Sequence, residues 1–544
     1  MAQKLSSKAK IVVTDSTVSL KKLAAIGDVY QYSGHGQMPR EMLLEKVANA
    51  DALFCLLRDK IDEELLGRAT KLKVVGTMSV GYEHIDLEAC RKRGVRIGYT
   101  PDVLTDATAE LGMALLLATA RRIPEAVRSA QTGGWKTWSP YYMCGKTLVD
   151  AVIGVYGMGK IGTCMANKIV AFKPKRIIYN NRRPVDSSPF EFVSFDALLA
   201  QSDFVIVCAA PSKENAQIFN RDAFEKMRKD SILINISRGI LVDIEALEEA
   251  LRDGRIRAAG LDVTDPEPLP TAHPLFSMDN CVILPHIGSA TYATRDLMAS
   301  TTEQNICNFF QGIEMVAELN TELPATNSEL SFPQPYELLS AELWLLIFGN
   351  LERNDLDSLC GKTLVDAVIG VYGMGKIGTC MANKIVAFKP KRIIYNNRRP
   401  VDSSPFEFVS FDALLAQSDF VIVCAAPSKE NAQIFNRGAF AKMRKDSILI
   451  NISRGILVDI EALEEALRDG RIRAAGLDVT DPEPLPTDHP LFSMDNCVIL
   501  PHIGSATYAT RDLMASTTEQ NIGNFFQGIE MVAELKFADL SDEY

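Results

Sequence analysis

A glycine-rich stretch, Val152 to Gly162, sets the strongest limit on how this chain can fold. Apolar residues lead into the turn Gly157-Met158-Gly159-Lys160-Ile161-Gly162, and a helical pattern follows. This order predicts a buried strand, a tight turn and a helix N-terminus, whose glycines allow the turn, the close approach of a pyrophosphate and close helix–strand packing. The free N–H groups and the dipole of that helix end favour phosphate. We therefore expect these six residues to bind a dinucleotide.

The same stretch recurs at Val368 to Gly378, because a long segment of the chain is repeated. Residues 144–319 recur as 360–535, and the copies differ only at Asp222/Gly438, Glu225/Ala441, Ala272/Asp488 and Cys307/Gly523. The repeat is longer than the roughly 20–50 residues of a solenoid unit, so it is a complete domain copied once. A genuine duplication and an error of gene assembly both explain it, and the intact mass of the native protein separates them. The second nucleotide-binding set is Gly373, Gly375, Lys376, Ile377 and Gly378.

Composition excludes several classes of function. The 544 residues carry a net charge of −11 without a basic block, which argues against a nucleic-acid partner. No apolar run is long enough to cross a membrane, and residues 1–10 lack a signal-peptide core, so we expect a cytoplasmic protein without a membrane partner. The eleven cysteines show neither CxxC spacing nor histidine neighbours, which predicts reduced thiols and no metal site.

Short apolar runs alternate with amphipathic runs through the first 118 residues. We expect strands at 11–13, 52–57, 73–78 and 95–99, and helices at 39–50, 62–69 and 84–91. This alternation predicts a parallel sheet with helices on its faces. Residues 106–121 form a long apolar helical run that we expect between two domains. Trp135 and Trp138 follow in a polar segment, which we interpret either as a contact surface or as ordinary packing.

The residues after the strand expected at 176–179 bear on the choice of cofactor. An acidic residue about 20 positions beyond the glycines would accept the ribose hydroxyls of NAD. Asn180-Asn181-Arg182-Arg183 stand there instead. Two guanidinium groups suit a 2′-phosphate, because they form bidentate, charge-assisted hydrogen bonds with it. We therefore predict NADP(H), with NAD as the alternative and a solvated basic turn as the non-functional interpretation.

Three further residues stand just beyond the ends of predicted strands. Arg238 follows the strand at 232–236, Glu267 follows the strand at 259–263, and His286 follows the strand at 281–284. A further strand is expected at 204–208. Ligands of parallel sheets bind beyond the carboxyl ends of their strands, so these side chains are expected to share one site.

Six motifs together resemble the D-2-hydroxyacid dehydrogenase family, most closely its glyoxylate and hydroxypyruvate reductases. They are TMSVGYEHID at 77–86, YTPDVLTDATAE at 99–110, GMGKIG at 157–162, NISRG at 235–239, GLDVTDPEPLP at 260–270 and ILPHIGSAT at 283–291. The resemblance implies an α/β fold of Rossmann-type doubly wound parallel sheets, with a flavodoxin-like substrate domain and two NAD(P)-binding domains. The expected division is 1–118 with 290–319 for substrate, 119–289 for cofactor, 320–359 as linker, 360–535 as second cofactor domain, and 536–544 as acidic tail.

The resemblance also implies a role for each matching residue. His286 would protonate the carbonyl oxygen, Glu267 would pair with the imidazolium, and Arg238 would hold the substrate carboxylate. Val80, Gly81 and Ser289 would complete the substrate site. Ala210, Ile236, Asp262 and Gly288 would join the glycine turn and Arg182 and Arg183 around the cofactor. The implied activity is the NADPH-dependent reduction of glyoxylate to glycolate and of hydroxypyruvate to D-glycerate. The alternative is an NAD-linked dehydrogenase of another 2-hydroxy acid, such as phosphoglycerate.

The second copy departs from the family pattern because no N-terminal domain precedes it. It retains Arg398, Arg399, Arg454, Asp478, Glu483 and His502 at the matching positions. A nucleotide-sensing scaffold is therefore the favoured interpretation of this copy. The family also implies pairing of cofactor domains, which predicts either a homodimer or an internal pseudo-dimer of the two copies. An apolar run at 337–351 is expected to dock somewhere on the protein.

Overall fold

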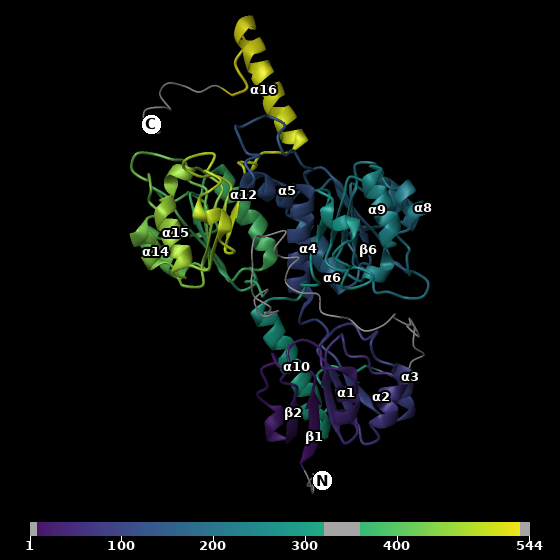
Figure 1. Ribbon diagram of the computed structural model, residues 1–544. Coiled ribbons are helices and arrows are strands. Elements are labelled where there is room, and N and C mark those ends of the chain that lie inside the picture. Colours follow the sequence, from purple (N-terminus) through teal and green to yellow (C-terminus); the bar gives the residue numbers. More distant parts are fainter. Residues whose placement is uncertain (1–7, 320–359, 534–544) are drawn as a thin grey trace.

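The computed structural model describes residues 8–319 and 360–533, which contain three parallel sheets (Figure 1). The predicted apolar run at 337–351 and the acidic tail lie outside these residues. The first sheet has the order β2-β1-β3-β4-β5, which is the flavodoxin-like order. Its strands are β1 (Ala9–Val13), β2 (Gly27–Gln31), β3 (Ala52–Cys55), β4 (Val74–Thr77) and β5 (Arg96–Gly98). Sequence patterns missed β2, because this edge strand is half-exposed and carries polar residues.

Short helices connect the strands of the first sheet. They are η1 (Leu23–Ala25), α1 (Arg40–Val47), α2 (Glu63–Arg68) and α3 (Leu87–Lys92). Asp62 and Asp86 begin α2 and α3 by accepting the N–H groups of Leu65 and Ala89, as helix-capping residues do. These side chains explain why the helices begin where the sequence places an acidic residue before an apolar pair.

The second sheet has the order β12-β11-β10-β9-β6-β7-β8, which is a Rossmann arrangement extended at one edge. Its strands are β6 (Val152–Tyr156), β7 (Arg176–Asn180), β8 (Glu191–Phe192), β9 (Phe204–Val207), β10 (Ile232–Asn235), β11 (Ala258–Leu261) and β12 (Cys281–Ile283). The helices within this unit are α6 (Lys160–Val170), α7 (Phe195–Gln201), α8 (Arg221–Lys226), α9 (Ile244–Arg252) and the short η2 (Gly239–Leu241) and η3 (Pro274–Ser277). From β6 the chain adds β7 and β8 on one side of the sheet, and from β9 it adds β10, β11 and β12 on the other, so the strand order reverses between the neighbours β6 and β9. The glycine turn follows β6. The predicted fold class is confirmed by this topology.

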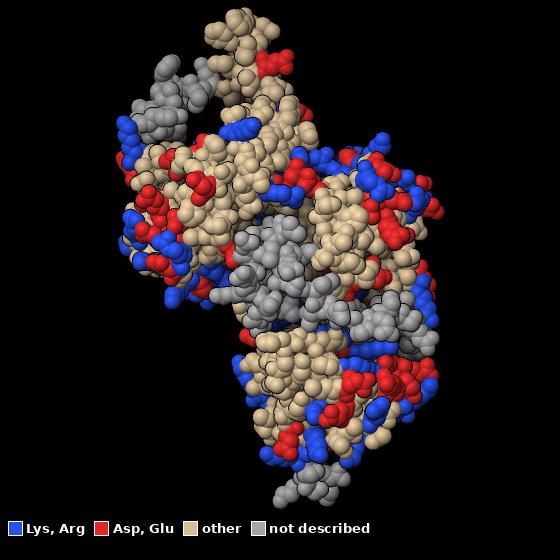
Figure 2. Space-filling view, viewed as in Figure 1, with Lys and Arg blue, Asp and Glu red and all other residues tan. Residues whose placement is uncertain are grey.

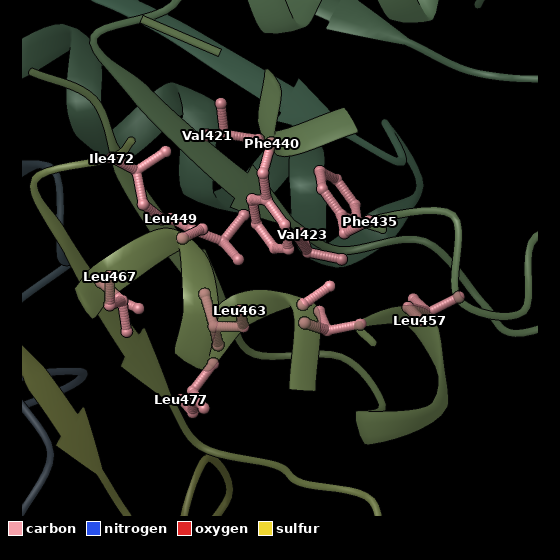
Figure 3. Packing of buried hydrophobic residues seen from close by; sticks show 14 of the residues in the cluster. Val421, Val423, Phe435, Phe440, Leu449, Leu457, Leu463, Leu467, Ile472 and Leu477 are labelled. Atoms are coloured by element: carbon pink, nitrogen blue, oxygen red, sulfur yellow. The ribbon is translucent and has the colours of Figure 1, made fainter. Parts of the chain in front are cut away.

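The repeat forms a third sheet with the matching order β15-β14-β13-β16-β17-β18-β19. Its strands are β13 (Val368–Tyr372), β14 (Arg392–Asn396), β15 (Glu407–Phe408), β16 (Phe420–Val423), β17 (Ile448–Asn451), β18 (Ala474–Leu477) and β19 (Cys497–Ile499). The helices are α12 (Lys376–Ile385), η5 (Val386–Phe388), α13 (Phe411–Gln417), α14 (Arg437–Lys442), η6 (Gly455–Leu457), α15 (Ile460–Arg468), η7 (Pro490–Ser493) and α16 (Tyr508–Gln527). Figure 3 shows the core on one side of this sheet, where Val421, Val423 and Leu449 meet Phe435, Phe440 and Leu463.

Three helices outside the sheet units join the parts of the molecule. The helix α4 (Thr105–Ala120) packs on α6, β10 and β11, so it covers the second sheet rather than the first. The helix α10 (Tyr292–Gln311) returns to the first sheet and contacts β3, β4 and β5. The helix α5 (Ile123–Gln131) contacts β19 of the third sheet. Figure 1 shows α4 and α5 between the two copies, while α16 projects away from the rest of the chain.

The two copies contact each other through reciprocal pairs of residues. The Gly145 N–H donates to the Ala506 carbonyl over 3.0 Å, and the matching Gly361 N–H donates to the Ala290 carbonyl over 2.9 Å. Arg257 lies over the ring of Tyr508, and Arg473 lies over the ring of Tyr292, at 5.6 and 5.8 Å. Such exchange of matching contacts is the mark of a two-fold interface. Here both halves of the interface belong to one chain.

The segment with the two tryptophans lies against the second copy. Trp135 is 6% exposed and joins the core of that copy, and the Tyr141 hydroxyl donates to Asp512 over 2.9 Å. Trp138 lies 4.5 Å from the Arg511 guanidinium in a cation–π contact. This arm precedes the repeat, so its contacts have no counterpart within the described residues of copy two.

Among residues 8–319 and 360–533, no helix is both long and apolar enough to cross a membrane.

Candidate active site

The glycine turn after β6 has the backbone needed to approach a phosphate. Gly157 has a φ of +100°, and a Cβ atom on Gly162 would lie 2.1 Å from the Gly157 carbonyl oxygen. A Cβ atom on Gly159 would meet no described atom within 4 Å, so the backbone there is open on the side where α6 begins. Met158, Lys160 and Ile161 lie within this turn and the first turn of α6. The turn therefore fits a dinucleotide pyrophosphate at the helix N-terminus.

Asn181 fixes the glycine turn from the neighbouring strand. Its side-chain oxygen accepts the Met158 N–H over 2.8 Å, and the Asn180 carbonyl accepts the Gly157 N–H over 3.0 Å. Arg182 and Arg183 follow directly, and both side chains are exposed. Neither forms an ion pair with the described residues. Sequence reasoning treated Asn181 only as the absence of an acid, whereas the structure gives it this positioning contact.

His286 and Glu267 form a close pair beyond β12 and β11. Nδ1 of His286 lies 2.5 Å from Oε1 of Glu267, and about a third of each side chain is exposed. Burial alone would lower the pKa of His286, but the charge of Glu267 and its hydrogen bond outweigh this effect and raise it. Burial opposes ionisation of Glu267, yet the imidazolium holds its pKa below the ordinary value. The pair therefore favours a charged imidazolium beside a carboxylate.

Asp262 positions the loop that carries His286. Its carboxylate accepts the N–H groups of Ile287 and Gly288 over 2.8 and 2.9 Å, and its carbonyl accepts the His286 N–H over 2.9 Å. His286 itself has a φ of +54°, a left-handed conformation that these bonds maintain. Asp262 is 2% exposed, and burial raises its pKa to about 6. The Asp262 side chain thus lies buried beneath the loop that carries His286, rather than exposed to solvent.

Arg238 meets the first sheet across the site. Its Nη1 donates to the Ser237 carbonyl over 2.8 Å, and its Nε lies 3.5 Å from Oε1 of Glu83. A Cβ atom on Gly81 would lie 2.1 Å from Nη2 of Arg238, so a side chain at position 81 would displace the guanidinium from this place. The loop after β4 is fixed by Ser79, whose hydroxyl donates to the Gly81 carbonyl over 2.7 Å. The structure therefore brings Arg238 and Gly81 together, as the motifs predict.

Glu83 is a residue of this site that sequence reasoning missed. One of its carboxylate oxygens is buried without a hydrogen bond, and the other faces Arg238. The sequence signal that could have found it is its place, as an acidic residue, in the motif TMSVGYEHID. Next to it, His84 lies 3.0 Å from the Thr77 hydroxyl, and burial lowers the pKa of His84 to about 4. His84 is therefore neutral near pH 7, and the only negative charge in this loop next to Arg238 is that of Glu83.

The remaining predicted residues follow strands of the second sheet, except Val80, which follows β4 of the first sheet. Val80 and Ser289 are half-buried in the loops after β4 and β12, Ile236 is 5% exposed after β10, and Ala210 is exposed after β9. Each of these residues follows the carboxyl end of a strand. The predicted set is thus assembled from the loops after β4, β6, β7, β9, β10, β11 and β12.

The second copy repeats the part of this arrangement that its own residues supply. His502 lies 2.5 Å from Glu483, whose hydrogen bond raises the pKa of the histidine, and Asp478 accepts the N–H groups of Ile503 and Gly504. Arg454 donates to the Ser453 carbonyl but is exposed. Within the described residues no loop faces Arg454 as the Gly81 loop faces Arg238. The glycine turn at Gly373, Gly375 and Gly378 keeps the geometry of the first copy, with Lys376 and Ile377 beginning α12 and Arg398 and Arg399 exposed after β14.

Comparison with known proteins agrees with this geometry. The family model for the NAD-binding domain of D-isomer-specific 2-hydroxyacid dehydrogenases matches residues 113–288 and again 346–504. The human glyoxylate reductase/hydroxypyruvate reductase is 46% identical over 301 residues, which cover 54% of this chain and 92% of the human one. This chain belongs to the D-isomer-specific 2-hydroxyacid dehydrogenase family. The predicted family is therefore confirmed, and the chain is an NAD(P)-dependent oxidoreductase of 2-hydroxy acids.

Other proteins have similar sequences and folds. A glyoxylate reductase of Thermofilum pendens is 43% identical over 289 residues, covering 52% of this chain and 85% of its own. A solved structure from Thermus thermophilus is 42% identical with a TM-score of 0.55, covering 57% of this chain and 100% of that one. An NADPH-dependent glyoxylate/hydroxypyruvate reductase from Sinorhizobium meliloti, solved with NADP and malonate, is 27% identical with a TM-score of 0.51 over 58% and 98%. Each of these similarities spans little more than half of this chain.

Proposed function

We propose that residues 9–319 form an NADPH-dependent reductase of glyoxylate and hydroxypyruvate, which yields glycolate and D-glycerate. The observation that carries the proposal is the convergence of the Glu267–His286 pair, Arg238 and the Gly81 loop at one sheet edge beside the glycine turn. The relatives named as glyoxylate and hydroxypyruvate reductases support this choice of substrates. The division into a substrate unit with its return helix and a cofactor unit belongs to the same proposal.

The side chains of the site divide the work of reduction. Arg238 binds the substrate carboxylate through its planar fork, together with the N–H groups of Val80 and Gly81. His286 donates a proton from a ring nitrogen to the carbonyl oxygen, and Glu267 keeps the imidazole charged and oriented. Before substrate binds, the Glu83 carboxylate pairs with the Arg238 guanidinium and holds it in place. The substrate carboxylate would then replace Glu83 as the partner of this guanidinium. NADPH, when bound, supplies the hydride.

The preference for NADPH rests on the residues after β7. Asn181 stands where an acid would repel a 2′-phosphate, and it supports the glycine turn instead. Arg182 and Arg183 are exposed and have no ion-pair partner among the described residues, so both can bind that phosphate. The relative from Sinorhizobium meliloti is NADPH-dependent and was solved with bound NADP, which is consistent with the proposal.

The second copy is proposed to bind NADPH without turning over substrate. Its glycine turn matches that of the first copy, whereas Arg454 faces no substrate loop among the described residues. The two copies together would then act as an internal pseudo-dimer through their reciprocal contacts. A single chain of about 60 kDa by light scattering supports this assembly, and dimers formed between chains contradict it.

Steady-state kinetics with both cofactors test the proposed function. We expect a higher kcat/KM with NADPH than with NADH for glyoxylate and hydroxypyruvate. Replacing Arg182 and Arg183 by serine should raise the KM for NADPH far more than that for NADH. The matched control replaces Arg398 and Arg399 in the second copy, and it should leave both KM values unchanged. Equal efficiency with the two cofactors would remove the cofactor preference, and inactivity on both substrates would remove the substrate assignment.

A further inference from the structure

The helix α16 exposes apolar side chains that its counterpart α10 buries. Met298 and Ile306 of α10 are 2% and 0% exposed, whereas the matching Met514 and Ile522 of α16 are 45% and 56% exposed. Phe526, near the end of the helix, is 81% exposed. Figure 2 shows that the projecting helix is mostly uncharged on the visible face. Exposed apolar surface on this scale marks an interaction site.

The surface of the N-terminal domain on which α10 packs, here called its seat, shows what this helix sequence recognises. Met298, Ala299, Ile306 and Cys307 join one core with Ile11, Val13, Phe54 and Val74 of the first sheet. Glu303 is 1% exposed, and its Oε1 accepts the backbone N–H groups of Lys21, Lys22 and Leu23 over 2.9, 2.9 and 3.2 Å. The receptor therefore offers an apolar sheet face and, beside it, the N-terminal N–H groups of η1. A carboxylate buried at that point is stable because these donors satisfy it.

The carboxylate of Glu519 limits which partner can pack on α16. It stands where α10 has Glu303, it is exposed, and no described residue hydrogen-bonds to its side chain. Two α16 helices packed face to face would bury two carboxylates without donors, which is costly. A partner built like the first sheet, with its η1 donors, would satisfy both Glu519 and the apolar side chains beside it.

The N-terminal domain of another copy of the wild-type chain is already occupied. Its own α10 fills the seat and carries Cys307, which is 4% exposed in the core. The matching residue of α16 is Gly523, which weakens the helix interior and leaves the space of the Cys307 side chain empty. The helix α16 would therefore lose any competition with a tethered α10. Its partner needs an open seat.

We propose that α16 is a docking site for a second substrate-binding domain, carried by a separate polypeptide. That domain has the five-stranded fold of residues 9–98, presents backbone donors to Glu519, and lacks a return helix of its own. Docked as the first sheet docks on α10, it would bring a Gly81-type loop to Arg454 and complete the half-site of Glu483 and His502. This last consequence rests on the proposed function, whereas the docking itself does not.

The full chain can supply an open seat if its own α10 is disabled. Met298→Asp with Glu303→Lys removes the apolar and acidic contacts of α10, so the N-terminal domain becomes free to accept α16 of another chain. We expect light scattering to show association, with a doubling of mass or more at micromolar concentration. Adding Met514→Asp and Glu519→Lys to this variant should restore the mass of a single chain. The α16 substitutions alone should leave the mass and the glyoxylate reduction of the wild-type chain unchanged.

Two outcomes would overturn the docking proposal. They are a single-chain mass for the α10-disabled variant, and association that persists after α16 is changed as well. Circular dichroism checks that the variant is folded. If it is not, the milder Met298→Ala with Glu303→Ala, which weakens both the apolar and the acidic contacts of the tethered α10, takes its place with the same expectation of α16-dependent association. An activity measurement separates docking from function. In the associated variant, His502→Ala should lower the remaining glyoxylate reduction at least tenfold. Association without this loss supports docking and contradicts the completed site.

Discussion

The two copies share nearly all of their residues but differ in what covers them. All four residues of β10 and of β11 are buried, whereas β17 and β18 alternate between buried and half-buried residues. Side chains of a strand alternate between the faces of its sheet, so on one face the described residues cover β17 and β18 only partly. The helix α4 covers that face in the first copy, and α4 precedes the repeated segment. The same residues thus form a core or a surface depending on the chain before them.

The same contrast holds at the catalytic end of the sheets. Arg238 faces Gly81 and Glu83 of the first sheet, while Arg454 is exposed. The histidine–glutamate pairs are alike, at 2.5 Å in both copies. Residues 144–319 therefore carry enough information for the sheet and for the histidine–glutamate pair. The loop with Gly81 and Glu83, which faces Arg238, comes from residues outside the repeat, and the following predictions separate the two contributions.

The largest expected difference is between the two histidines. His286→Ala should lower kcat/KM for glyoxylate reduction by roughly 10²–10⁴-fold, because it removes the proposed general acid. His502→Ala is the matched control in the same surroundings of glutamate and aspartate, and it should leave the rate within a factor of two. Steady-state kinetics on purified full-length variants measure both. Substantial activity in the first variant, or a comparable loss in the second, would mean that copy two is catalytic.

A second difference concerns the number of bound cofactors. A Cβ atom at Gly162 or Gly378 would lie 2.1 Å from the carbonyl oxygen of Gly157 or Gly373, so alanine at either position distorts its turn. The wild-type chain should bind two NADPH by fluorescence titration, and each variant should bind one. Gly162→Ala should also lose activity, because it affects the site that turns over substrate, whereas Gly378→Ala should retain it. One NADPH per wild-type chain would contradict binding by copy two.

Sequence reasoning located the strand ends where the signal is local. The glycine turn, Arg238, Glu267 and His286 were predicted because each follows a strand whose apolar run is visible in the sequence. It missed β2, whose polar edge sequence lacks such a run, and Glu83, whose role appears only when the first sheet meets Arg238. It could not foresee that Ile236 is 5% exposed while the identical Ile452 is half-buried, because that difference depends on α4. Long-range packing is the part that a local pattern does not contain.

The glutamates provide a third, smaller difference, in the pH dependence of reduction. The raised pKa of His286 means that its proton-donating form persists above pH 6.5, so kcat/KM for reduction should fall as the pH rises through that raised value. Glu267→Gln removes the charge that raises this pKa and leaves the burial that lowers it. The fall should therefore move to lower pH. Glu483→Gln should leave the profile unchanged, and an unshifted profile for Glu267→Gln would show that another group donates the proton.

The smallest expected difference tests whether α4 covers only the first copy. A Cβ atom at Gly260 of β11 would lie 2.5 Å from the Thr119 hydroxyl and 3.0 Å from Leu115, both in α4, and 2.9 Å from Ile234 of β10. The same atom at Gly476 of β18 would meet no described atom within 4 Å. Gly260→Ala should therefore cost about 1–3 kcal/mol through overpacking, and Gly476→Ala should stay within about 0.5 kcal/mol. Thermal unfolding should show a midpoint lowered by several degrees for the first variant only. Equal losses would mean that a segment outside the described residues covers β18 as closely as α4 covers β11.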